Sequence, residues 1–507
     1  MGEDYRRIAD RVAEAIADGR LRPGDRLPPQ RVFARRHRIA ASTAIRVYGE
    51  LRRRGLVVGE VGRGTFVRAA PPLPGPALAE ATGAAPVDLQ LNYPVVEGQT
   101  ELMARALASL ARADVLAEAT RRPTAAVGTG EARAAAASVL ARGGWEPDPD
   151  AVLFAGNSRQ AIAAAISALV PPGGRLGVEA LTYPLVKAVA DRLGVRLVPI
   201  ALDAEGMRPD ALAAAHRAAP LGAVYVQPTL HNPLSLTMGS RRRAELAGFL
   251  RESGLTAIED TTWAFLLPDG REEPDEWACS GGSASPDGPG SPDGRGEPDG
   301  RGALDGRGGP GWWGALDEQG APDGRGGPDG AVAPAPLVAY APERVVLVDS
   351  LSKRLAPGLT VGYLVAPEAR RADLADALRS GAWTAGGLAL AAATRWAGDG
   401  TVAAVVAAKR ADLAARGDVV RRRLGAYAIR TAPLSSYCWW ELPAPWRAET
   451  FVAAAAERAG VAVTPGSAFA VGSGSAPDAV RVGLASPSLP VLDEALGALS
   501  SLAAEGP

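Results

Sequence analysis

From about residue 89 onward, short apolar runs typical of β-strands alternate with alanine-rich runs typical of helices. The clearest strand-like runs are AVLFAG, RLGVEA, VRLVPI, GAVYVQP, LTAIED and RVVLVDS. Such an alternation predicts an open, mostly parallel β-sheet that is covered by helices. The larger part of the chain is therefore expected to belong to the α/β class.

Two segments interrupt or precede this alternation. The longer one, at about residues 268–335, is rich in Gly, Pro and Asp, with PDGRG recurring at positions 292, 298 and 322. Because a segment of this composition cannot bury enough apolar surface to fold, we predict a disordered surface insertion. Residues 71–88 are rich in Pro and Ala, which indicates a semi-rigid linker between a first domain at residues 1–70 and a second at residues 89–507.

The first of these two domains differs from the rest of the chain in charge. It contains 16 Arg against 8 Asp and Glu, whereas the whole chain of 507 residues has a net charge of −1. A basic domain joined to an acidic remainder suggests an anionic partner for the basic domain.

The sequence pattern of the basic domain predicts three helices followed by a β-hairpin. The apolar residues that mark the helices are Tyr5, Ile8, Val12 and Ile16, then Val32 and Phe33, then Ile45, Tyr48 and Leu51. In the third helix, which Ser42 can cap, we expect Ile45 to face inward and Arg46 to face outward. The run LVVGEVGRGTFVR predicts the hairpin. This is the layout of a winged helix-turn-helix, whose third helix enters the DNA major groove while cationic side chains contact phosphates.

Residues 4–68 resemble the DNA-binding domain of the GntR family. The resemblance rests on the P-G-x-x-L-P…R start, the T…Y…L helix and the G-x-G-T-F-V wing. It implies contacts with double-stranded DNA from five residues, Arg31, Thr43, Arg46, Arg63 and Gly64. Where many relatives have Ser-Arg at the start of the third helix, this chain has Ala40-Ala41, so the base preference does not carry over. The alternative is that the arginines form an ordinary solvated surface.

Lysine is rare in this chain. Only Lys187, Lys353 and Lys409 are lysines among the 55 basic residues, and Lys353 lies in the stretch LVDSLSKRLAPGLTVGYLVAP. A primary amine can act as a nucleophile, whereas a guanidinium stays protonated at any accessible pH. The alternative is a surface lysine without a chemical role.

Residues 89 to about 500 resemble the fold-type I enzymes of aminotransferase class I and II, which use pyridoxal 5′-phosphate (PLP). The resemblance implies a mostly parallel sheet covered by helices and a small C-terminal α+β subdomain. Lys353, in S-L-S-K, matches the lysine that forms the Schiff base with PLP, and its amine is made nucleophilic by desolvation and neighbouring cations. Asp260, in LTAIED, matches the aspartate that pairs with the pyridine nitrogen. Asn232, in QPTLHNP, matches the asparagine that donates to the phenolate oxygen.

The same resemblance implies further contacts. Ser158 and Arg159, at a Gly-led turn into a helix, and Ser350 match positions that hold the phosphate. Tyr183 is the candidate for stacking on the ring. Arg481, in AVRVGLASP, resembles the arginine that binds the α-carboxylate of a substrate.

Three positions depart from the family pattern. Thr360 stands where relatives carry an arginine that pairs with the phosphate, a charge-assisted bond worth about 1.5–3 kcal/mol. Arg354 or Arg159 could supply the missing charge. Trp263 replaces a tyrosine that contacts the phenolate, and Pro123 replaces a tyrosine that reaches the phosphate of the partner subunit. We therefore expect weak or no sustained transaminase activity.

A GntR-type domain joined to an aminotransferase-like domain is similar to the MocR/GabR family of PLP-binding transcription regulators. The resemblance implies a homodimeric regulator that senses an amino acid or amine through aldimine exchange at Lys353. Two alternatives stay open: an active aminotransferase that carries a DNA-binding domain, and a regulator that has lost PLP.

The cysteine content and the absence of a long apolar run indicate the compartment. Two cysteines, Cys279 and Cys438, provide neither a disulfide framework nor the spacing of a metal site, which is typical of a reducing cytosol. We find no signal peptide in the first residues and no apolar run long enough to cross a bilayer as a helix. The sequence therefore predicts a cytoplasmic protein without metal and without a membrane span.

Overall fold

The computed structural model describes residues 5–17, 20–21, 25–53, 56–60, 64–67, 85–121, 124–268, 334–472 and 476–506. We call the residues up to 67 the head and those from 85 onward the body. The predicted insertion and linker lie almost entirely outside the described residues. Strand β4 (Val87–Asp88) pairs in parallel with β16 (Val461–Ala462), so the last residues of the predicted linker belong to the folded body.

The head contains three helices and a small sheet, as the sequence predicted. Its helices are α1 (Tyr5–Ala17), α2 (Gln30–Arg36) and α3 (Ala41–Arg53). Its antiparallel sheet has the order β1-β3-β2, formed by β1 (Arg26–Leu27), β2 (Val57–Glu60) and β3 (Gly64–Val67). Ile8, Phe33, Tyr48 and Leu51 are buried in its core.

Two predictions for α3 were wrong. Ile45 is 55% exposed, because the buried stripe of this helix runs through Ala44, Val47, Tyr48 and Leu51 and leaves Ile45 on the solvent side. Ser42 does not cap the helix, which already begins at Ala41.

A seven-stranded sheet forms the centre of the body, in the order β5-β13-β12-β11-β10-β6-β7. The strands are β5 (Val152–Ala155), β6 (Arg175–Glu179), β7 (Arg196–Ile200), β10 (Ala223–Val226), β11 (Thr256–Asp260), β12 (Val345–Ser350) and β13 (Gly362–Val365). Only β13 runs antiparallel to its neighbours β12 and β5. All six strand-like runs of the sequence are thus strands of one mostly parallel sheet.

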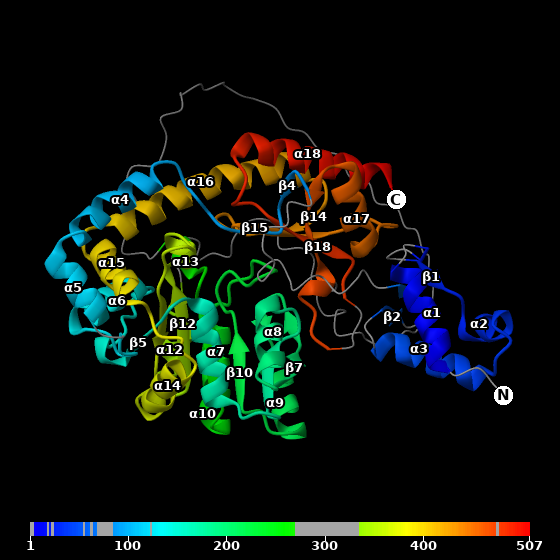
Figure 1. Cartoon of the computed structure of the whole chain (residues 1–507), viewed down its shortest axis with the longest axis horizontal. Coiled ribbons are helices and arrows are strands. Elements are labelled where there is room, and N and C mark those ends of the chain that lie inside the picture. The colour runs from blue at the N-terminus through cyan, green and yellow to red at the C-terminus, as the bar shows by residue number, and fades with distance from the viewer. Residues whose placement is uncertain are drawn as a thin grey trace, which may run out of the picture.

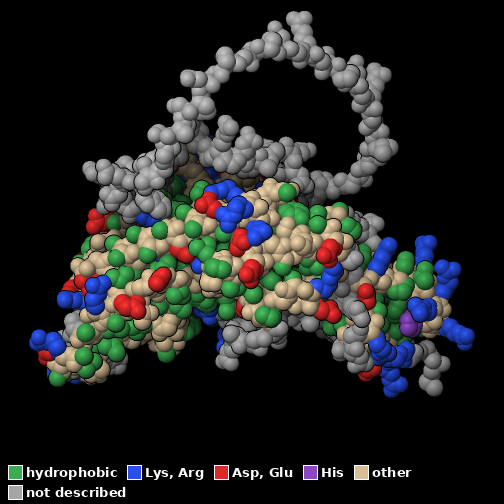
Figure 2. Space-filling view, turned by 90° about the horizontal axis from the view of Figure 1, so that it is seen from above, with side chains coloured by type: hydrophobic (Ala, Val, Ile, Leu, Met, Phe, Trp, Pro, Cys, Tyr) green, Lys and Arg blue, Asp and Glu red, His purple; other side chains and the backbone are tan. Residues whose placement is uncertain are grey.

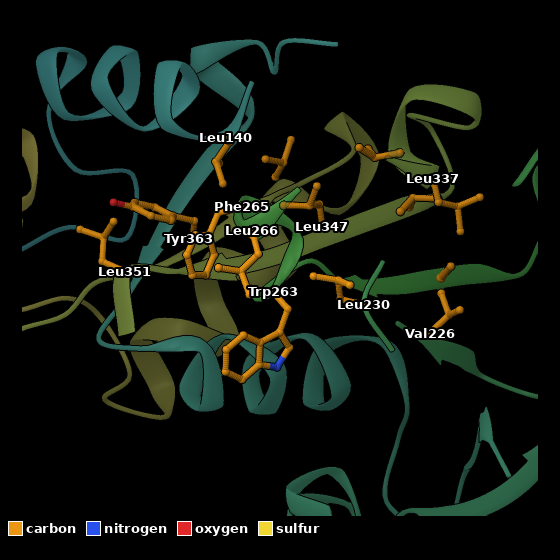
Figure 3. Packing of buried hydrophobic residues seen from close by; sticks show 14 of the residues in the cluster. Leu140, Val226, Leu230, Trp263, Phe265, Leu266, Leu337, Leu347, Leu351 and Tyr363 are labelled. Carbon is orange, nitrogen blue, oxygen red and sulfur yellow. The ribbon is translucent and has the colours of Figure 1, made fainter. Parts of the chain in front are cut away.

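Helices cover both faces of this sheet (Figure 1). The helices of this part are α6 (Gly130–Leu140), α7 (Ser158–Leu169), α8 (Pro184–Arg192), α9 (Pro209–Ala218), α10 (Ser240–Ser253), α12 (Leu337–Tyr340), α13 (Leu351–Arg354), α14 (Glu368–Ser380) and α15 (Gly387–Gly398). Successive residues of β12 point to opposite faces: Val346 and Val348 join the apolar cluster of α7, α8 and α14, and Leu347 joins that of α10 and α12. Figure 3 shows Leu347 on this second face, with Leu337, Leu266 and Trp263.

The C-terminal part forms a smaller α+β subdomain. It contains a four-stranded sheet of order β14-β15-β18-β17. Its strands are β14 (Ala428–Arg430), β15 (Tyr437–Glu441), β17 (Thr464–Pro465) and β18 (Ala479–Gly483), and its helices are α17 (Ala448–Arg458) and α18 (Leu489–Glu505). The 24-residue helix α16 (Thr401–Leu424) packs against α18 of the subdomain and also against α4 (Gln99–Leu110) and α15 of the larger part (Figure 1).

The short elements complete the described body. They are helix α5 (Ala113–Arg121), the hairpin β8 (Leu202–Asp203) and β9 (Gly206–Met207), and single 3-10 turns at Pro149–Ala151, Ala264–Leu266 and Gly466–Ala468. None of the described helices has the length and apolarity needed to cross a membrane.

Candidate functional site

A pocket opens at the carboxyl ends of the central strands. In open α/β sheets, ligands bind in the crevice outside these ends. Six residues predicted from the sequence line this pocket: Lys353, Asp260, Asn232, Ser158, Tyr183 and Arg481. The space within its outline is about 700 Å³, part of it continuous with solvent.

Lys353 lies in the short helix α13, directly after the buried strand β12. Its Nζ donates to the backbone oxygen of Asn92 at 2.6 Å and lies 3.6 Å from the centre of the Tyr93 ring. Removal from water lowers the pKa of this amine well below its usual value, and the nearby charges of Arg481, Arg159 and Lys409 lower it further. These surroundings favour the neutral, nucleophilic form of the amine.

Asp260 is the last residue of β11 and is held by two donors. The Tyr225 hydroxyl donates to its Oδ2 at 2.6 Å, and the Thr262 backbone N–H donates to its Oδ1 at 2.9 Å. Burial raises the pKa of the carboxyl group, and both hydrogen bonds oppose that rise. A carboxylate fixed in this way can pair with a protonated ring nitrogen.

Arg481 carries a buried positive charge without an acidic partner. It is 6% exposed, and no carboxylate of the described residues lies within 4 Å of its guanidinium. Its Nη1 donates to Asn232 Oδ1 at 3.4 Å, its Nη2 donates to the oxygen of Gln90, and its Nε has no acceptor among the described residues. Because a buried charge without a counter-ion is costly, this side chain is suited to binding an anionic ligand.

The start of α7 contributes to the wall of the pocket. Asn157 caps the helix by accepting from the Gln160 N–H at 3.0 Å, Ser158 lines the pocket, and Arg159 Nη2 donates to the Tyr93 hydroxyl at 3.1 Å. Gly362 of β13 permits this arrangement, because a Cβ there would come within 2.4 Å of the Asn157 backbone oxygen. A helix N-terminus next to a guanidinium can bind a phosphate.

The structure does not bring Arg354 and Ser350 into the pocket. Arg354 is 4% exposed and its Nη2 bonds Asp349 Oδ2 at 2.7 Å, and the same carboxylate also pairs with Arg142 at 3.3 Å. Ser350 accepts from the Ser352 N–H and so caps α13. Of the two arginines that could replace the residue missing at position 360, Arg159 is therefore the one near the pocket.

Sequence reasoning missed several residues of the site. Tyr93 and Asn92 come from an extended segment far from Lys353 in the chain, so no local signal marks them. Tyr225 is a hydroxyl-bearing residue in an otherwise aliphatic strand, which was the one available signal. Gln227 lines the pocket, is 5% exposed and has no partner for its Nε2 among the described residues.

The predicted DNA-contacting residues lie on the head. Arg31 of α2 and Arg46 of α3 are exposed, and Thr43 is half-buried. Gly64 begins β3 with φ +127°, a backbone conformation that favours glycine. Figure 2 shows the arginine side chains that project from the head. Arg63 and Pro123 lie outside the described residues.

The donor set of the pocket agrees with PLP. No group of three His, Cys, Asp or Glu side chains suited to a metal ion occurs within the described ranges. The pocket combines an amine, a carboxylate, amide groups and a helix N-terminus, and the free Gln227 Nε2 leaves a buried donor for a ligand. These are the groups that an aldehyde, a pyridine nitrogen, a phenolate and a phosphate require.

Two protein families match parts of this chain. Residues 4–67 match the gntR family of bacterial regulatory proteins, and residues 323–499 match aminotransferase class I and II. Among curated proteins, the HTH-type transcriptional regulator YdeF of Bacillus subtilis is 26% identical over 98% of this chain and 94% of its own length. YdcR of Escherichia coli and TauR of Rhodobacter capsulatus are each 25% identical, over 53% and 51% of this chain and 62% and 58% of their own lengths.

Solved structures share the fold of the body. An archaeal alanine:glyoxylate aminotransferase has a TM-score of 0.63 at 18% identity and covers 91% of this chain and 94% of its own. The α-aminoadipate aminotransferase LysN of Thermus thermophilus has a TM-score of 0.61 at 20% identity, covering 84% of this chain and 94% of its own. The chain therefore joins a GntR-family helix-turn-helix domain to a fold-type I aminotransferase domain, the combination found in transcription regulators of the MocR type.

Proposed function

We propose that this protein is a DNA-binding transcription regulator whose body binds PLP at Lys353 and senses an amino acid or amine. The observation that carries the proposal is the environment of the Lys353 amine. Burial lowers the pKa of this amine, nearby cationic groups lower it further, and no carboxylate of the described residues lies within 4 Å of it. Asp260, Asn232 and Arg481 line the same pocket.

PLP, when bound, supplies an aldehyde that can join the amine of a lysine or of a ligand. Lys353 is proposed to hold the cofactor, Asp260 to keep the ring nitrogen protonated and Asn232 to donate to the phenolate. Tyr183, whose hydroxyl pKa burial raises to about 12, stays neutral and is proposed to pack on the ring. Ser158, Arg159 and the start of α7 are proposed to hold the phosphate.

The unpaired charge of Arg481 indicates the chemistry of the effector. A ligand with an amine for the Lys353 side of the pocket and a carboxylate for Arg481 is an amino acid. Its binding would replace contacts that Lys353 and Arg481 now make within the protein by contacts with the ligand. Only a difference in affinity between two states of the protein can then change DNA binding.

The head is proposed to bind double-stranded DNA through Arg31, Thr43, Arg46 and the wing. Support comes from the exposed arginines of α2 and α3 and from the match to the gntR family. A homodimer would present two heads to paired half-sites, and DNA as partner agrees with a location in the cytoplasm.

A working aminotransferase is the second candidate, because the solved structures with the same fold are aminotransferases and the pocket contains Lys353, Asp260 and Arg481. Measurement of product over time distinguishes the two. A regulator converts at most about one equivalent of amino acid per bound cofactor, whereas an enzyme turns over repeatedly when a keto acid is added.

The proposal is tested by two measurements on the full-length protein. Incubation with PLP followed by borohydride reduction and peptide mass spectrometry should place the adduct on Lys353; Lys187→Ala should keep it and Lys353→Ala should lose it. A genome-wide DNA-binding map with and without amino acids should show discrete sites whose occupancy changes. Absence of an adduct at Lys353 refutes cofactor binding, and absence of enriched sites refutes the regulator.

A further inference from the structure

A second lysine lies directly behind Lys353. Lys409, in the first half of α16, is fully buried, and its Nζ donates to the backbone oxygens of Lys353 at 2.9 Å and Leu355 at 2.7 Å. Both oxygens lie at the end of α13, where helix carbonyls lack partners within the helix. Lys409 therefore fixes the backbone of the residue that carries the reactive amine.

This position suits a lysine rather than an arginine. An ammonium is a compact charge with three donors, and it can serve two carbonyl oxygens in a closed space where a planar guanidinium needs more room. No carboxylate of the described residues lies within 4 Å of Nζ, so the charge of Lys409 is not neutralised by an ion pair. Its electrostatic effect on the pocket is therefore not cancelled.

Other residues of α16 bond the backbone just after two residues that line the pocket, Trp263 and Arg481. Arg410 donates to the backbone oxygens of Phe265 and Leu267, in the segment that follows Trp263. Arg416 donates to the oxygen of Leu484 at 2.6 Å, three residues after Arg481. One long helix thus holds the backbone near Lys353, Trp263 and Arg481, which all line the pocket.

The charge of Lys409 also acts on Lys353. Burial lowers the pKa of Lys409 to about 7, and the Lys409 charge is one of the groups that lower the pKa of Lys353. The other charged or titratable groups that face the Lys353 amine are Arg481 from β18, Arg159 from α7, Tyr93, whose ring centre lies 3.6 Å from Nζ, and Asp260 and Tyr183 at the pocket wall. Below about pH 7, where Lys409 is charged, its charge opposes protonation of Lys353 most strongly.

We propose that Lys409 is a positioning residue for Lys353, which it holds through the α13 carbonyls and whose neutral, nucleophilic form it favours by its positive charge. This inference rests on the proposed role of Lys353 in binding PLP. A purely structural Lys409 would affect folding and leave the titration of Lys353 unchanged, which gives the two roles different signatures.

The test uses the full-length protein without cofactor. Lys353 is acetylated with trace acetic anhydride between pH 5 and 10, and its labelling rate is measured by peptide mass spectrometry. In Lys409→Met, the midpoint of the labelling profile should move to higher pH, so that labelling near pH 6 falls. Lys409→Arg keeps the charge above pH 7, and its midpoint should stay at or below that of the wild type.

The control is Lys187→Met, since Lys187 also donates to two backbone oxygens, those of Ala468 and Ala470, without being among the charges that act on Lys353. Its midpoint should equal the wild-type value. Thermal unfolding shows which variants are folded; if Lys409→Met is not, the comparison of Lys409→Arg with the wild type above pH 7 carries the test. An unchanged midpoint in Lys409→Met, or a raised midpoint in Lys409→Arg, overturns the inference.

Failure of the proposed function gives a different result. A wild-type protein that forms no PLP adduct, yet shows the shifted labelling in Lys409→Met, retains the coupling between the two lysines and loses the cofactor role. A wild-type protein that binds PLP with no shift in Lys409→Met retains the cofactor role and loses this inference.

Discussion

The head and the pocket of the body both depend on positive charge, and they use it in opposite ways. Arg31, Arg35 and Arg46 project from the head into solvent, where a guanidinium stays charged and can reach phosphates from several directions. Around the pocket, Arg354 and Lys409 are buried and bonded at fixed positions by Asp349 and by backbone oxygens. Exposed charge is suited to a large partner with many phosphates, whereas buried charge is suited to holding nearby protein atoms in place.

This difference predicts which substitutions disturb folding and which disturb binding. An exposed side chain loses little when it is removed, because water replaces its contacts. Removal of a buried ion is costly, because the partner of opposite charge then stays buried without a counter-ion or water around it.

A large contrast in stability is expected between two single arginine substitutions. Arg354→Ala should lower the free energy of unfolding by about 3 kcal/mol, near the lower end for a broken buried pair, because Arg142 still pairs with Asp349. Arg35→Ala, on the head, should change it by less than about 0.5 kcal/mol. Urea unfolding measures both, and equal losses would break the comparison.

The pH dependence of stability should follow the buried lysines. The pKa of Lys409 is about 7 in the folded protein against the ordinary 10.5, so between these values the unfolded chain binds a proton that the folded chain does not. The free energy of unfolding should therefore rise as the pH increases from about 7 toward 10, by an amount on the order of a few kcal/mol. The low pKa of Lys353 acts in the same direction.

Denaturant unfolding at several pH values measures this rise. In Lys409→Met the rise should be smaller, whereas Lys187→Met serves as the matched control. If the free energy of unfolding of Lys409→Met rises with pH as steeply as that of the wild type, the pKa of Lys409 is not lowered by burial.

Cofactor affinity should depend on Arg159, which lies near the pocket. Arg159→Ala should weaken PLP binding by roughly 10- to 100-fold, which corresponds to the loss of one charge-assisted bond. Arg159→Lys should restore part of the affinity. Equilibrium dialysis at matched protein stability provides the measurement, and an Arg159→Ala protein with unchanged affinity would show that the phosphate is held elsewhere.

The exposed arginines of the head should affect DNA binding alone. Arg46→Ala should weaken binding to an enriched site by about 1–3 kcal/mol, and Arg31→Ala should reduce the salt dependence of binding if it contacts a phosphate. Fluorescence anisotropy at several salt concentrations measures both effects. The PLP adduct at Lys353 serves as the internal control and should not change.

The smallest effect is expected at Ile45. Because it is 55% exposed, Ile45→Ser should change the free energy of unfolding by less than about 0.5 kcal/mol, whereas Leu51→Ala in the core of the head should cost about 2–5 kcal/mol. A loss of DNA affinity in Ile45→Ser without loss of stability would indicate an apolar contact with a base, such as a thymine methyl group.

Local pattern was sufficient for much of the fold. The six apolar runs became strands of one sheet because each is short and apolar and most are followed by an α-helix. Lys353, Asp260 and Asn232 could be chosen from the sequence because each lies in a short motif that resembles the aminotransferase family. Parallel strands bring their carboxyl ends to one edge of the sheet, and the three residues line one pocket there.

The tertiary structure alone decided how the charges are paired. Arg354 is next to Lys353 in the chain, yet its side chain turns to Asp349, whereas Arg159, which is distant in the chain, lies at the pocket. The Tyr93 ring lies next to the amine of Lys353 and Lys409 bonds its backbone oxygen, and neither residue carries a local signal. Sequence patterns report which face of an element is buried; they do not report which distant groups meet there, because those contacts depend on how the elements pack.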